Sequence, residues 1–312
     1  MIISASRRTD IPAFYSDWLM NRLQDGEVLV KNPRNPKRSS RIILNPDVVD
    51  CIVFWTKNPK PMLTKLDAIE KMGYPFYFQF TLTPYDETVE KRMPPKSEIM
   101  ETFKRLSEKI GAHRVIWRYD PVMVSKELNI EYHLDAFGKM TDVLGDYTDR
   151  CIFSYIDFYA RMQKRTKEMV EHEVNELNMN RIAEGFSTIA SEHQLSLSTC
   201  SETIDLSPFG ISHASCIDQG MVEEIIGCPI NAKKDPNQRA ACGCIESVDI
   251  GSYDSCSYGC VYCYATTSQD AVLQNMRQHN KKSSILIGAP DPDDIVTDRK
   301  AKSQKISQLT LF

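Results

Sequence analysis

The chain has 312 residues, of which 42% are hydrophobic and 26% charged, so it can bury a sizeable core, either as one large α/β domain or as a barrel with a smaller appendage. Its formal net charge of −4 gives no global basic footprint, so a nucleic-acid substrate is not favoured. No segment approaches the roughly 18 uninterrupted apolar residues of a membrane span, and no basic and then apolar leader opens the chain. We therefore expect a cytoplasmic protein without a membrane partner.

Short apolar runs rich in β-branched and aromatic residues alternate along the chain with longer stretches of helical period. This alternation predicts an α/β fold with a parallel sheet and helices packed outside it. The expected strands are Ile2–Ala5, Cys51–Trp55, Phe76–Leu82, Arg114–Arg118, Cys151–Ile156 and Leu195–Cys200. The expected helical faces lie within residues 62–72, 99–110 and 134–144.

Several segments stand outside this alternation. Two strand-like runs, Val28–Val30 and Ile42–Leu44, predict a hairpin insertion, and the basic stretch from Arg34 to Arg41 between them predicts a solvated loop. Beyond residue 264 we expect a helix, a short strand, an acidic turn and an apolar tip that either moves freely or docks. Their ranges are 265–278, 284–288, 290–294 and 309–312.

Three cysteines fall within eight residues of the C-terminal part, in the run Cys256-Ser-Tyr-Gly-Cys260-Val-Tyr-Cys263. A metal centre held by three protein thiolates keeps one coordination position for a group that reacts, and the same difference separates catalytic from structural zinc sites. The C-x3-C-x2-C spacing therefore predicts a metal site that performs chemistry. Gly259 provides the tight turn that so short a loop requires.

This run resembles the motif of the radical S-adenosylmethionine (radical SAM) enzymes, in which three cysteines hold a [4Fe-4S] cluster with one iron free for the cofactor. The residue before the last cysteine is commonly aromatic in that superfamily, and here it is Tyr262, which the resemblance assigns to cofactor binding. The string from Cys256 to Ala265 is similar to the subgroup that includes spore photoproduct lyase. In the superfamily the motif normally follows the first barrel strand, whereas here it lies about fifty residues from the C-terminal end.

The whole chain resembles an uncharacterised family, a domain of unknown function with this C-terminal cysteine group and with openings like Ser4-Ala-Ser-Arg7-Arg8-Thr9-Asp10-Ile-Pro12. The radical SAM resemblance implies a partial (β/α)6 TIM-type barrel, at about residues 1–205, with a cysteine-rich region, residues 206–312, packed on its mouth. It also implies reductive cleavage of SAM to methionine and a 5′-deoxyadenosyl radical, which abstracts hydrogen from an unidentified substrate. Such an enzyme needs an electron donor, for example a ferredoxin or flavodoxin.

Active sites of parallel barrels form at the carboxyl ends of the strands, and here those ends are rich in polar and aromatic residues. We expect Arg118 and Asp120 to bind the carboxylate and the ribose of SAM, since a guanidinium pairs with a carboxylate and an aspartate accepts hydroxyl protons. Arg7 and Arg8 follow the first strand, where two arginines require an anion or carboxylates, so we expect both to bind the cofactor, with Asp10 as an internal partner. For each single residue, a strand-end cap or an ion pair within the barrel is an equally good interpretation.

Other cysteines suggest a second metal site. The best four-thiolate set is Cys200, Cys216, Cys242 and Cys244, which would hold an auxiliary iron-sulfur cluster or zinc, with His213 as an alternative ligand. Cys51 and Cys151 open strand-like runs, so we interpret them as buried apolar residues.

Two other functions stay open. The chain has no G-x-S-x-G elbow, no P-loop and no G-x-G-x-x-G fingerprint, so hydrolase, NTPase and Rossmann dehydrogenase functions lose their usual support. The first alternative is a non-catalytic metalloprotein in which Cys256, Cys260 and Cys263 join Cys244 in a closed zinc or structural iron-sulfur site. The second is a nucleic-acid lesion repair lyase, which rests on the similarity to spore photoproduct lyase and which the acidic net charge disfavours.

Overall fold

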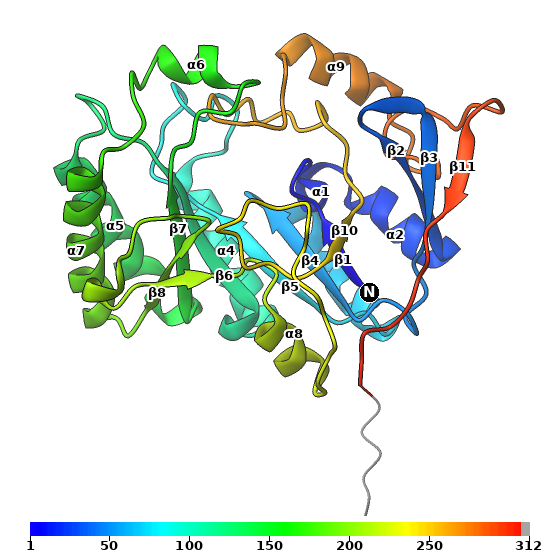
Figure 1. Ribbon diagram of the computed structural model, residues 1–312, viewed down its shortest axis with the longest axis horizontal. Coiled ribbons are helices and arrows are strands. Elements are labelled where there is room, and N and C mark those ends of the chain that lie inside the picture. Colours follow the sequence, from blue (N-terminus) through cyan, green and yellow to red (C-terminus); the bar gives the residue numbers. More distant parts are fainter. Residues whose placement is uncertain (307–312) are drawn as a thin grey trace, which may run out of the picture.

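A computed structural model of the protein describes residues 1–306, and its centre is a sheet of eight parallel strands (Figure 1). The strand order is β10-β1-β4-β5-β6-β7-β8-β9, and within the described residues the sheet does not close into a barrel. The strands are β1 (Ile2–Ala5), β4 (Cys51–Thr56), β5 (Phe76–Thr81), β6 (Val115–Val122), β7 (Arg150–Tyr155), β8 (Ser196–Cys200), β9 (Ser212–Ala214) and β10 (Ser247–Asp249).

All six predicted strands are present. The central strands are largely buried on both faces of the parallel sheet, whereas β8, near its edge, alternates between buried and more exposed residues. Only one boundary differs from its prediction by more than one residue. The strand expected to end at Arg118 continues to Val122, past Pro121. Pro121 has no backbone N–H, and the register of β6 against β7 shifts between Tyr119 and Val122, which accommodates the missing donor inside the strand.

Helices cover one face of the sheet and bury the larger core. The three predicted helical faces are confirmed, and the first of them begins as a 3₁₀ turn, Lys60–Lys65, because Pro61 stands at its start. Trp117 of the sheet stacks on Phe137, which stacks on Phe186, with ring centroids 5.2 and 4.1 Å apart. The helices are α1 (Ile11–Phe14), α2 (Ser16–Asp25), α3 (Leu66–Lys71), α4 (Lys96–Ile110), α5 (Ile130–Leu144), α6 (Gln163–Lys167), α7 (Glu176–Glu192), α8 (Gln219–Ile226) and α9 (Gln269–Gln278).

The opposite face of the sheet carries a second, smaller core. Helix α8 and the long connections on either side of it pack there, at the lower front of Figure 1. Side chains from five neighbouring strands contribute to this core: Ile2, Cys51, Val53, Tyr77, Ile116 and Ile152. The C-terminal part of the chain therefore covers the face that the outer helices leave open. Because both faces are covered, side chains on both faces of the central strands are buried.

The predicted hairpin is confirmed as β2 (Glu27–Asn32) and β3 (Asn35–Ile43), which pair antiparallel, with β11 (Ile295–Asp298) parallel to β3. The basic stretch is not a loop as predicted: most of it belongs to β3. Its side chains are largely exposed, and Arg41 pairs with Glu27 and Asp298 at 3.4 and 3.2 Å. The strand forms there because two neighbouring strands supply its backbone partners.

The C-terminal region joins the main sheet at both edges, since β9 pairs with β8 and β10 with β1. The helix expected at 265–278 forms as α9, which begins later because Ser268 caps it. The strand expected at 284–288 does not form, and Ile285 makes a single bridge to Leu29. The expected turn at 290–294 contains a hydrogen bond from Asp294 N to Asp291 O. The apolar tip at 309–312 lies outside the described residues.

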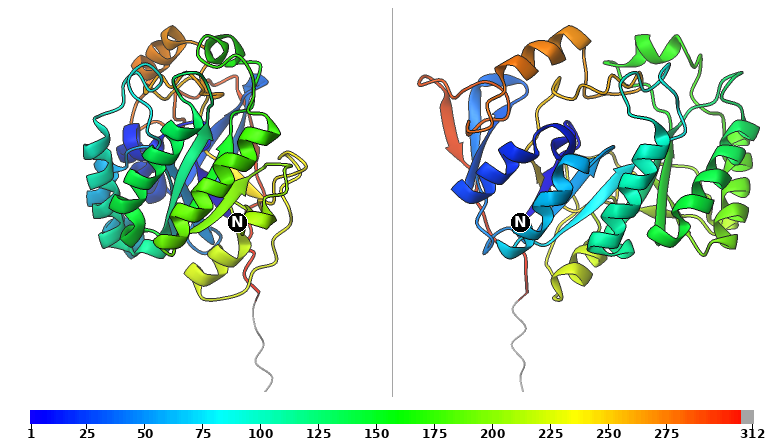
Figure 2. Two further views of the ribbon diagram at one scale, coloured as in Figure 1. Left: turned by 90° about the vertical axis from the view of Figure 1, so that its left-hand side faces the viewer. Right: turned by 180° about the vertical axis from the view of Figure 1, so that it is seen from behind.

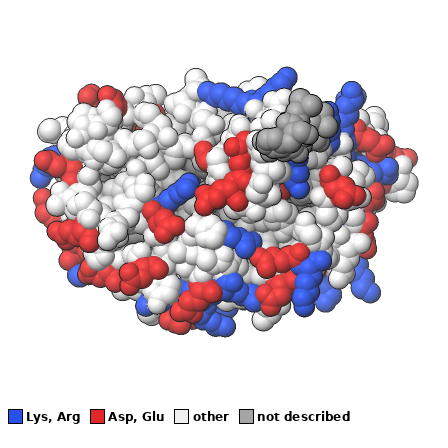
Figure 3. All heavy atoms as spheres, turned by 90° about the horizontal axis from the view of Figure 1, so that it is seen from below, with Lys and Arg blue, Asp and Glu red and all other residues white. Residues whose placement is uncertain are grey.

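The views in Figure 2 place α6 and α9 at one end of the sheet and α8 at the other. None of the helices within residues 1–306 is long and apolar enough to cross a membrane. Figure 3 shows acidic and basic side chains mixed over the face of the molecule that is seen from below.

Candidate functional site

The three-cysteine loop lies across the carboxyl ends of β1 and β5, two strands from the N-terminal part of the chain. Its backbone forms an antiparallel bridge between Cys260 and Glu90, in the connection that follows β5. Hydrogen bonds from Val261 N to Val89 O (3.0 Å) and from Arg92 N to Tyr258 O (3.0 Å) flank that bridge. The loop is therefore held by the β5 connection, although it comes from the far end of the chain (Figure 1).

The connection after β1 holds the same loop from the other side. Thr9 Oγ1 donates to Ser252 O at 2.6 Å, and the Tyr15 hydroxyl donates to Ser255 O at 2.6 Å. Gly251 lies so close to the β1 end that a Cβ there would stand 2.0 Å from Ser6 Oγ. These contacts fix the entry to the cysteine loop beside the end of β1.

Inside the loop the chain turns at Gly259, whose φ of +70° is left-handed, as the sequence predicts. Burial raises the pKa of Cys260 to about 12 and that of Cys256 well above its ordinary value, and nearby thiols add to this effect. Arg165 of α6 donates to the carbonyls of Cys263 and Thr266, both at 2.8 Å. The loop is thus held on a fixed backbone, and the free thiols of Cys256 and Cys260 stay protonated at neutral pH.

A buried carboxylate with two lysines lies next to Cys260. Lys57 Nζ donates to Glu90 Oε1 at 2.6 Å, Thr83 Oγ1 donates to the same oxygen at 2.7 Å, and Lys96 donates to Oε2. Burial works to raise the pKa of Glu90, but the two lysines outweigh it and hold the pKa at about 2. The carboxylate with its two ammonium groups leaves one net positive charge beside the loop, and Lys57 lowers the pKa of Cys260.

Tyr262, predicted to bind the cofactor, points back into this network. Its hydroxyl donates to Glu90, and its ring lies 6.1 Å from that of Tyr85, with Lys57 Nζ 5.4 Å from the ring centroid. The structure therefore gives Tyr262 a clear structural task, which is to connect the cysteine loop to Glu90. Its predicted contact with a cofactor stays a prediction.

Arg118, which is buried, and Asp120, which is half-buried, form an ion pair within β6. Arg118 Nη1 also donates to Cys216 Sγ at 2.8 Å, and its guanidinium lies 5.5 Å from the ring of Trp55. Asp120 accepts a second hydrogen bond from Ser154. The pair that sequence analysis assigned to SAM thus has protein partners of its own.

The expected pairing of Arg7 and Arg8 with Asp10 is wrong. Asp10 caps α1, accepting from Ala13 N at 3.0 Å, and accepts from Lys57 N at 2.7 Å. The carboxylate beside the arginines belongs to Asp249, which accepts from Arg7 N at 2.8 Å and lies 3.9 Å from Arg8 Nε. The reason is topological, because β10 pairs with β1 and brings its last residue to the β1 end.

The two arginines point to different surroundings. The Arg7 guanidinium lies 5.2 Å from the ring of Trp55, and its Nη2 is buried without a hydrogen-bond partner. Arg8 lies over Tyr253, 5.2 Å from the ring centroid. Trp55 thus has Arg7 and Arg118 both near its ring, and its Nε1 is also buried and unpaired. A hydrogen-bond acceptor that reached these two buried donors would satisfy them.

The four cysteines of the predicted second site come together from separate parts of the chain. Cys200 Sγ and Cys216 Sγ are 3.0 Å apart, and Cys244 contacts both Cys216 and Cys242. Contact with Cys216 lowers the pKa of Cys200, and contacts with Cys216 and Cys242 lower that of Cys244. His213 is exposed and lies 3.2 Å from Thr199 Oγ1, without a contact to these thiols.

Within residues 1–306 no three His, Cys, Asp or Glu side chains already surround a common point as metal ligands do. The donor chemistry of the three-cysteine loop nevertheless suits a thiophilic centre, since Cys256, Cys260 and Cys263 are soft donors on one anchored loop with a cationic neighbour. Cys51 and Cys151 are fully buried among apolar side chains, as expected.

Sequence analysis missed three residues that shape the site, namely Glu90, Arg165 and Asp249. Glu90 and Arg165 stand in charged stretches that resemble exposed surface, and nothing local marks them as buried. Asp249 ends β10, a strand of only three residues with one apolar side chain, so its segment carries no local strand signal either.

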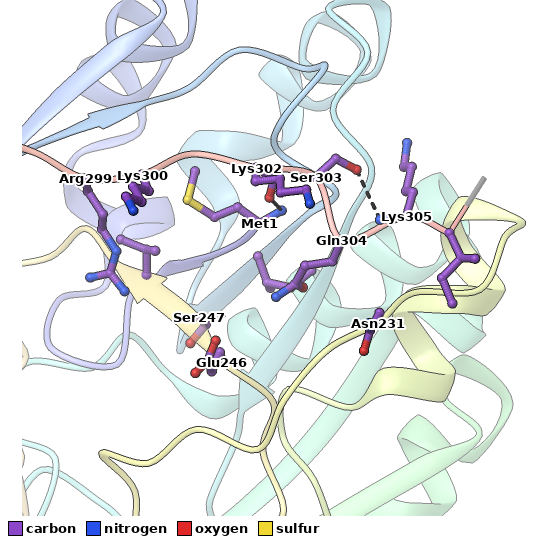
Figure 4. A pocket seen from close by; sticks show the side chains of 13 residues that line it. Met1, Asn231, Glu246, Ser247, Arg299, Lys300, Lys302, Ser303, Gln304 and Lys305 are labelled. Atoms are coloured by element: carbon purple, nitrogen blue, oxygen red, sulfur yellow. Dashed lines mark hydrogen bonds between the residues drawn. The ribbon is translucent and has the colours of Figure 1, made fainter.

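A pocket of about 400 Å³ lies at the opposite, amino-terminal edge of the sheet (Figure 4). Met1 lies in it, and its amino group donates to Val48 O at 2.8 Å and Lys302 O at 2.9 Å. Basic side chains line one side: Arg299, Lys300, Lys302 and Lys305. This pocket is separate from both cysteine groups, so we do not place the chemistry there.

Comparisons with known proteins give a family and only distant structures. No curated protein matches the chain. A "putative alpha-L-fucosidase" from Bacteroides thetaiotaomicron VPI-5482 is 10% identical over 75% of this chain and 83% of its own, with a TM-score of 0.27. An HpcH/HpaI aldolase from Desulfitobacterium hafniense DCB-2 is 11% identical over 62% of this chain and 89% of its own, with a TM-score of 0.24. Residues 2–265 match the family described as a domain of unknown function, DUF1848. The chain therefore belongs to the DUF1848 family.

Proposed function

We propose that this protein is a radical SAM enzyme whose [4Fe-4S] cluster is held by Cys256, Cys260 and Cys263. The observation that carries the proposal is the anchoring of this three-thiol loop at the carboxyl ends of parallel strands, where enzymes of this architecture build their active sites. The proposal also includes a barrel-like arrangement of the strands. Strands β1 and β4 to β8 would form a partial (β/α)6 barrel, with β9 and β10 added at its edges.

When bound, the cluster would supply one electron that breaks the C5′–S bond of SAM, giving methionine and a 5′-deoxyadenosyl radical that takes a hydrogen atom from the substrate. The electron would come from a one-electron donor protein such as a ferredoxin or flavodoxin. The substrate class stays open.

The residues around the loop have tasks that suit this chemistry. Lys57 and Lys96 would offset the negative charge of the thiolates, while Glu90 holds both ammonium groups in place. Arg7 offers an unpaired, buried N–H to the carboxylate of SAM or of a substrate. Tyr262 and Arg165 both hold the C-terminal end of the loop, Tyr262 through Glu90 and Arg165 through the carbonyl of Cys263.

The closed-site alternative needs Cys244 as a fourth ligand beside Cys256, Cys260 and Cys263. Cys244 instead contacts Cys216 and Cys242, which supports a loop with three thiols only. For the repair-lyase alternative, the net charge of −4 and the mixed charges in Figure 3 offer no support.

The test is anaerobic reconstitution of the purified protein with iron and sulfide, followed by iron counting and an assay for 5′-deoxyadenosine from SAM under a strong reductant. We expect about four iron atoms per chain and 5′-deoxyadenosine formation, both lost in Cys260→Ala. The matched control is Cys228→Ala, which removes a half-buried thiol outside both cysteine groups and should retain both. Stoichiometric zinc in the loop, without iron uptake or SAM cleavage, would overturn the proposal.

A further inference from the structure

We propose that Cys200, Cys216, Cys242 and Cys244 bind a single zinc ion that ties the long C-terminal connections to the sheet. The site is separate from the three-cysteine loop, and the inference does not depend on the proposed radical chemistry. It rests on the convergence of the four thiols, on the fit of their spacing to one ion, and on the charges around them.

Convergence is the first argument. Cys200 ends β8, Cys216 follows β9, and Cys242 and Cys244 lie in the connection between α8 and β10. Three distant segments thus bring their thiols to one place on the covered face of the sheet. Free cysteines buried only for their apolar character, such as Cys151, have no such reason to gather.

The backbone shows the same convergence. A Cβ on Gly243 would stand 2.5 Å from Ser215 Oγ, so the Cys-Gly-Cys turn approaches the segment of Cys216 closely. Ser201, next to Cys200, adopts a left-handed φ of 58° and hydrogen-bonds the thiol of Cys242. The contacts therefore run from Cys200 through Cys216 and Cys244 to Cys242, and back to the neighbour of Cys200.

The spacing favours one ion over a cluster. Four thiolates around a tetrahedral zinc, with bonds of about 2.3 Å, lie about 3.8 Å from one another. Neighbouring thiols in this group already touch, whereas a [4Fe-4S] cube would hold them farther apart. Within the described residues the four sulfurs do not surround a common point, so side-chain rotation must accompany binding to complete the tetrahedron.

Charge is the third argument. Zinc with four thiolates carries two net negative charges, which would be costly to bury without cations. Two guanidinium groups lie beside the cysteines: Arg118 donates to Cys216 Sγ at 2.8 Å, and Arg7 is near Cys244 and Cys216. The amide of Ile217 donates to Cys244 Sγ at 3.3 Å, a hydrogen bond typical of metal-bound thiolates.

A structural ion suits this part of the fold. The connection between α8 and β10 runs over 20 residues without a helix or strand, and it covers the face of the sheet that carries the smaller core. Long irregular connections lose much conformational entropy when they order, and a closed zinc site offsets that cost.

The test measures zinc in full-length protein that lacks the loop cysteines, Cys256→Ala, Cys260→Ala and Cys263→Ala together. We expect about one zinc ion per chain to remain, and to be lost when Cys244→Ser is added but kept when Cys228→Ser is added instead. Cobalt in place of zinc should give the visible absorption of a four-thiolate site. Loss of all zinc in the loop variant, or iron in its place, overturns the assignment.

A second measurement avoids the risk that Cys244→Ser fails to fold. The unmutated protein, purified under reducing conditions, is alkylated with and without a zinc chelator and its cysteines are mapped by mass spectrometry. We expect the chelator to expose Cys200, Cys216, Cys242 and Cys244 to alkylation together. A disulfide between Cys200 and Cys216, or alkylation that the chelator does not change, contradicts the proposal.

Discussion

The hydroxyl of Tyr262 donates a hydrogen bond to the buried carboxylate of Glu90 and so joins the cysteine loop to the connection after β5. Residues 172 positions apart in sequence thus share one buried network, in which Glu90 also holds Lys57 and Lys96. The loop depends on that carboxylate for both its place and its charge environment.

Replacement of Glu90 by Gln should lower the free energy of unfolding by about 3 kcal/mol, because it leaves two ammonium groups near each other without their carboxylate. The matched control is Glu98→Gln, which breaks an exposed pair with Lys60 and should change stability by less than about 0.5 kcal/mol. Urea unfolding at pH 7 measures both. Equal effects of the two variants would refute the structural role of Glu90.

The same carboxylate predicts a pH dependence. The folded-state pKa of Glu90 is about 2, below its ordinary value of 4.5, so its contribution is complete above pH 4.5 and is lost as the pH falls from 4.5 toward 2. The unmutated protein should therefore lose its stability advantage over Glu90→Gln across that range. Urea unfolding of both proteins at a series of acidic pH values measures this, and a constant difference would contradict the prediction.

Glu202 should give a pH dependence of stability opposite in sign to that of Glu90. Burial raises its pKa from 4.5 to about 7, so the folded state loses stability relative to a neutral residue as the pH rises from 4.5 to 7. Glu202→Gln should be more stable than the parent at pH 8 by about 1 to 2 kcal/mol, a value reduced for partial exposure, and equal to it near pH 4. Thermal unfolding at both pH values measures the difference, with the exposed Glu192→Gln as control.

A second anchor at the C-terminal end of the cysteine loop is Arg165, which donates to carbonyls of Cys263, Thr266 and Thr267. Arg165→Ala should speed amide exchange in residues 256–267, because the carbonyls of Cys263, Thr266 and Thr267 lose their donor. Lys164→Ala, an exposed neighbour on α6, is the matched control. Unchanged exchange in the Arg165 variant would show that α6 does not hold the loop.

The close approach at Gly251 can be tested with a second glycine as reference. Gly251→Ala places a Cβ 2.6 Å from Ser6 Cβ and should destabilise the protein by about 1 to 3 kcal/mol. Gly138→Ala, inside α5 with its nearest side-chain atom at 4.0 Å, should instead stabilise by about 0.5 to 1 kcal/mol. The order of the two melting temperatures is the readout, and a Gly251→Ala protein as stable as the parent would contradict the contact.

The sequence predicts the strands because burial on both faces leaves a local pattern that needs no knowledge of neighbours. Arg34 to Arg41 shows the limit of that reasoning: the stretch is polar and locally resembles a loop, yet β2 and β11 make it a strand. Its structure depends on pairing partners, one of which lies more than 250 residues away.

The candidate site also contains residues that the local sequence reveals and residues that only long-range pairing brings into place. The thiols of Cys256, Cys260 and Cys263 are visible in sequence because one short loop carries them. The partner of Arg7 and Arg8 was misassigned to the nearby Asp10, since the pairing of β10 with β1 that presents Asp249 is a long-range event. Glu90 could not be predicted, because its burial depends on two lysines and a tyrosine from other segments.

The most direct test of the proposed function is the EPR spectrum of the reconstituted, reduced protein, recorded without and with SAM. The proposal predicts the signal of a reduced [4Fe-4S] cluster that changes when SAM is added and is absent from Cys260→Ala. A signal that SAM does not alter, or one that persists in Cys260→Ala, would contradict the assignment of Cys256, Cys260 and Cys263 as the ligands of a SAM-binding cluster.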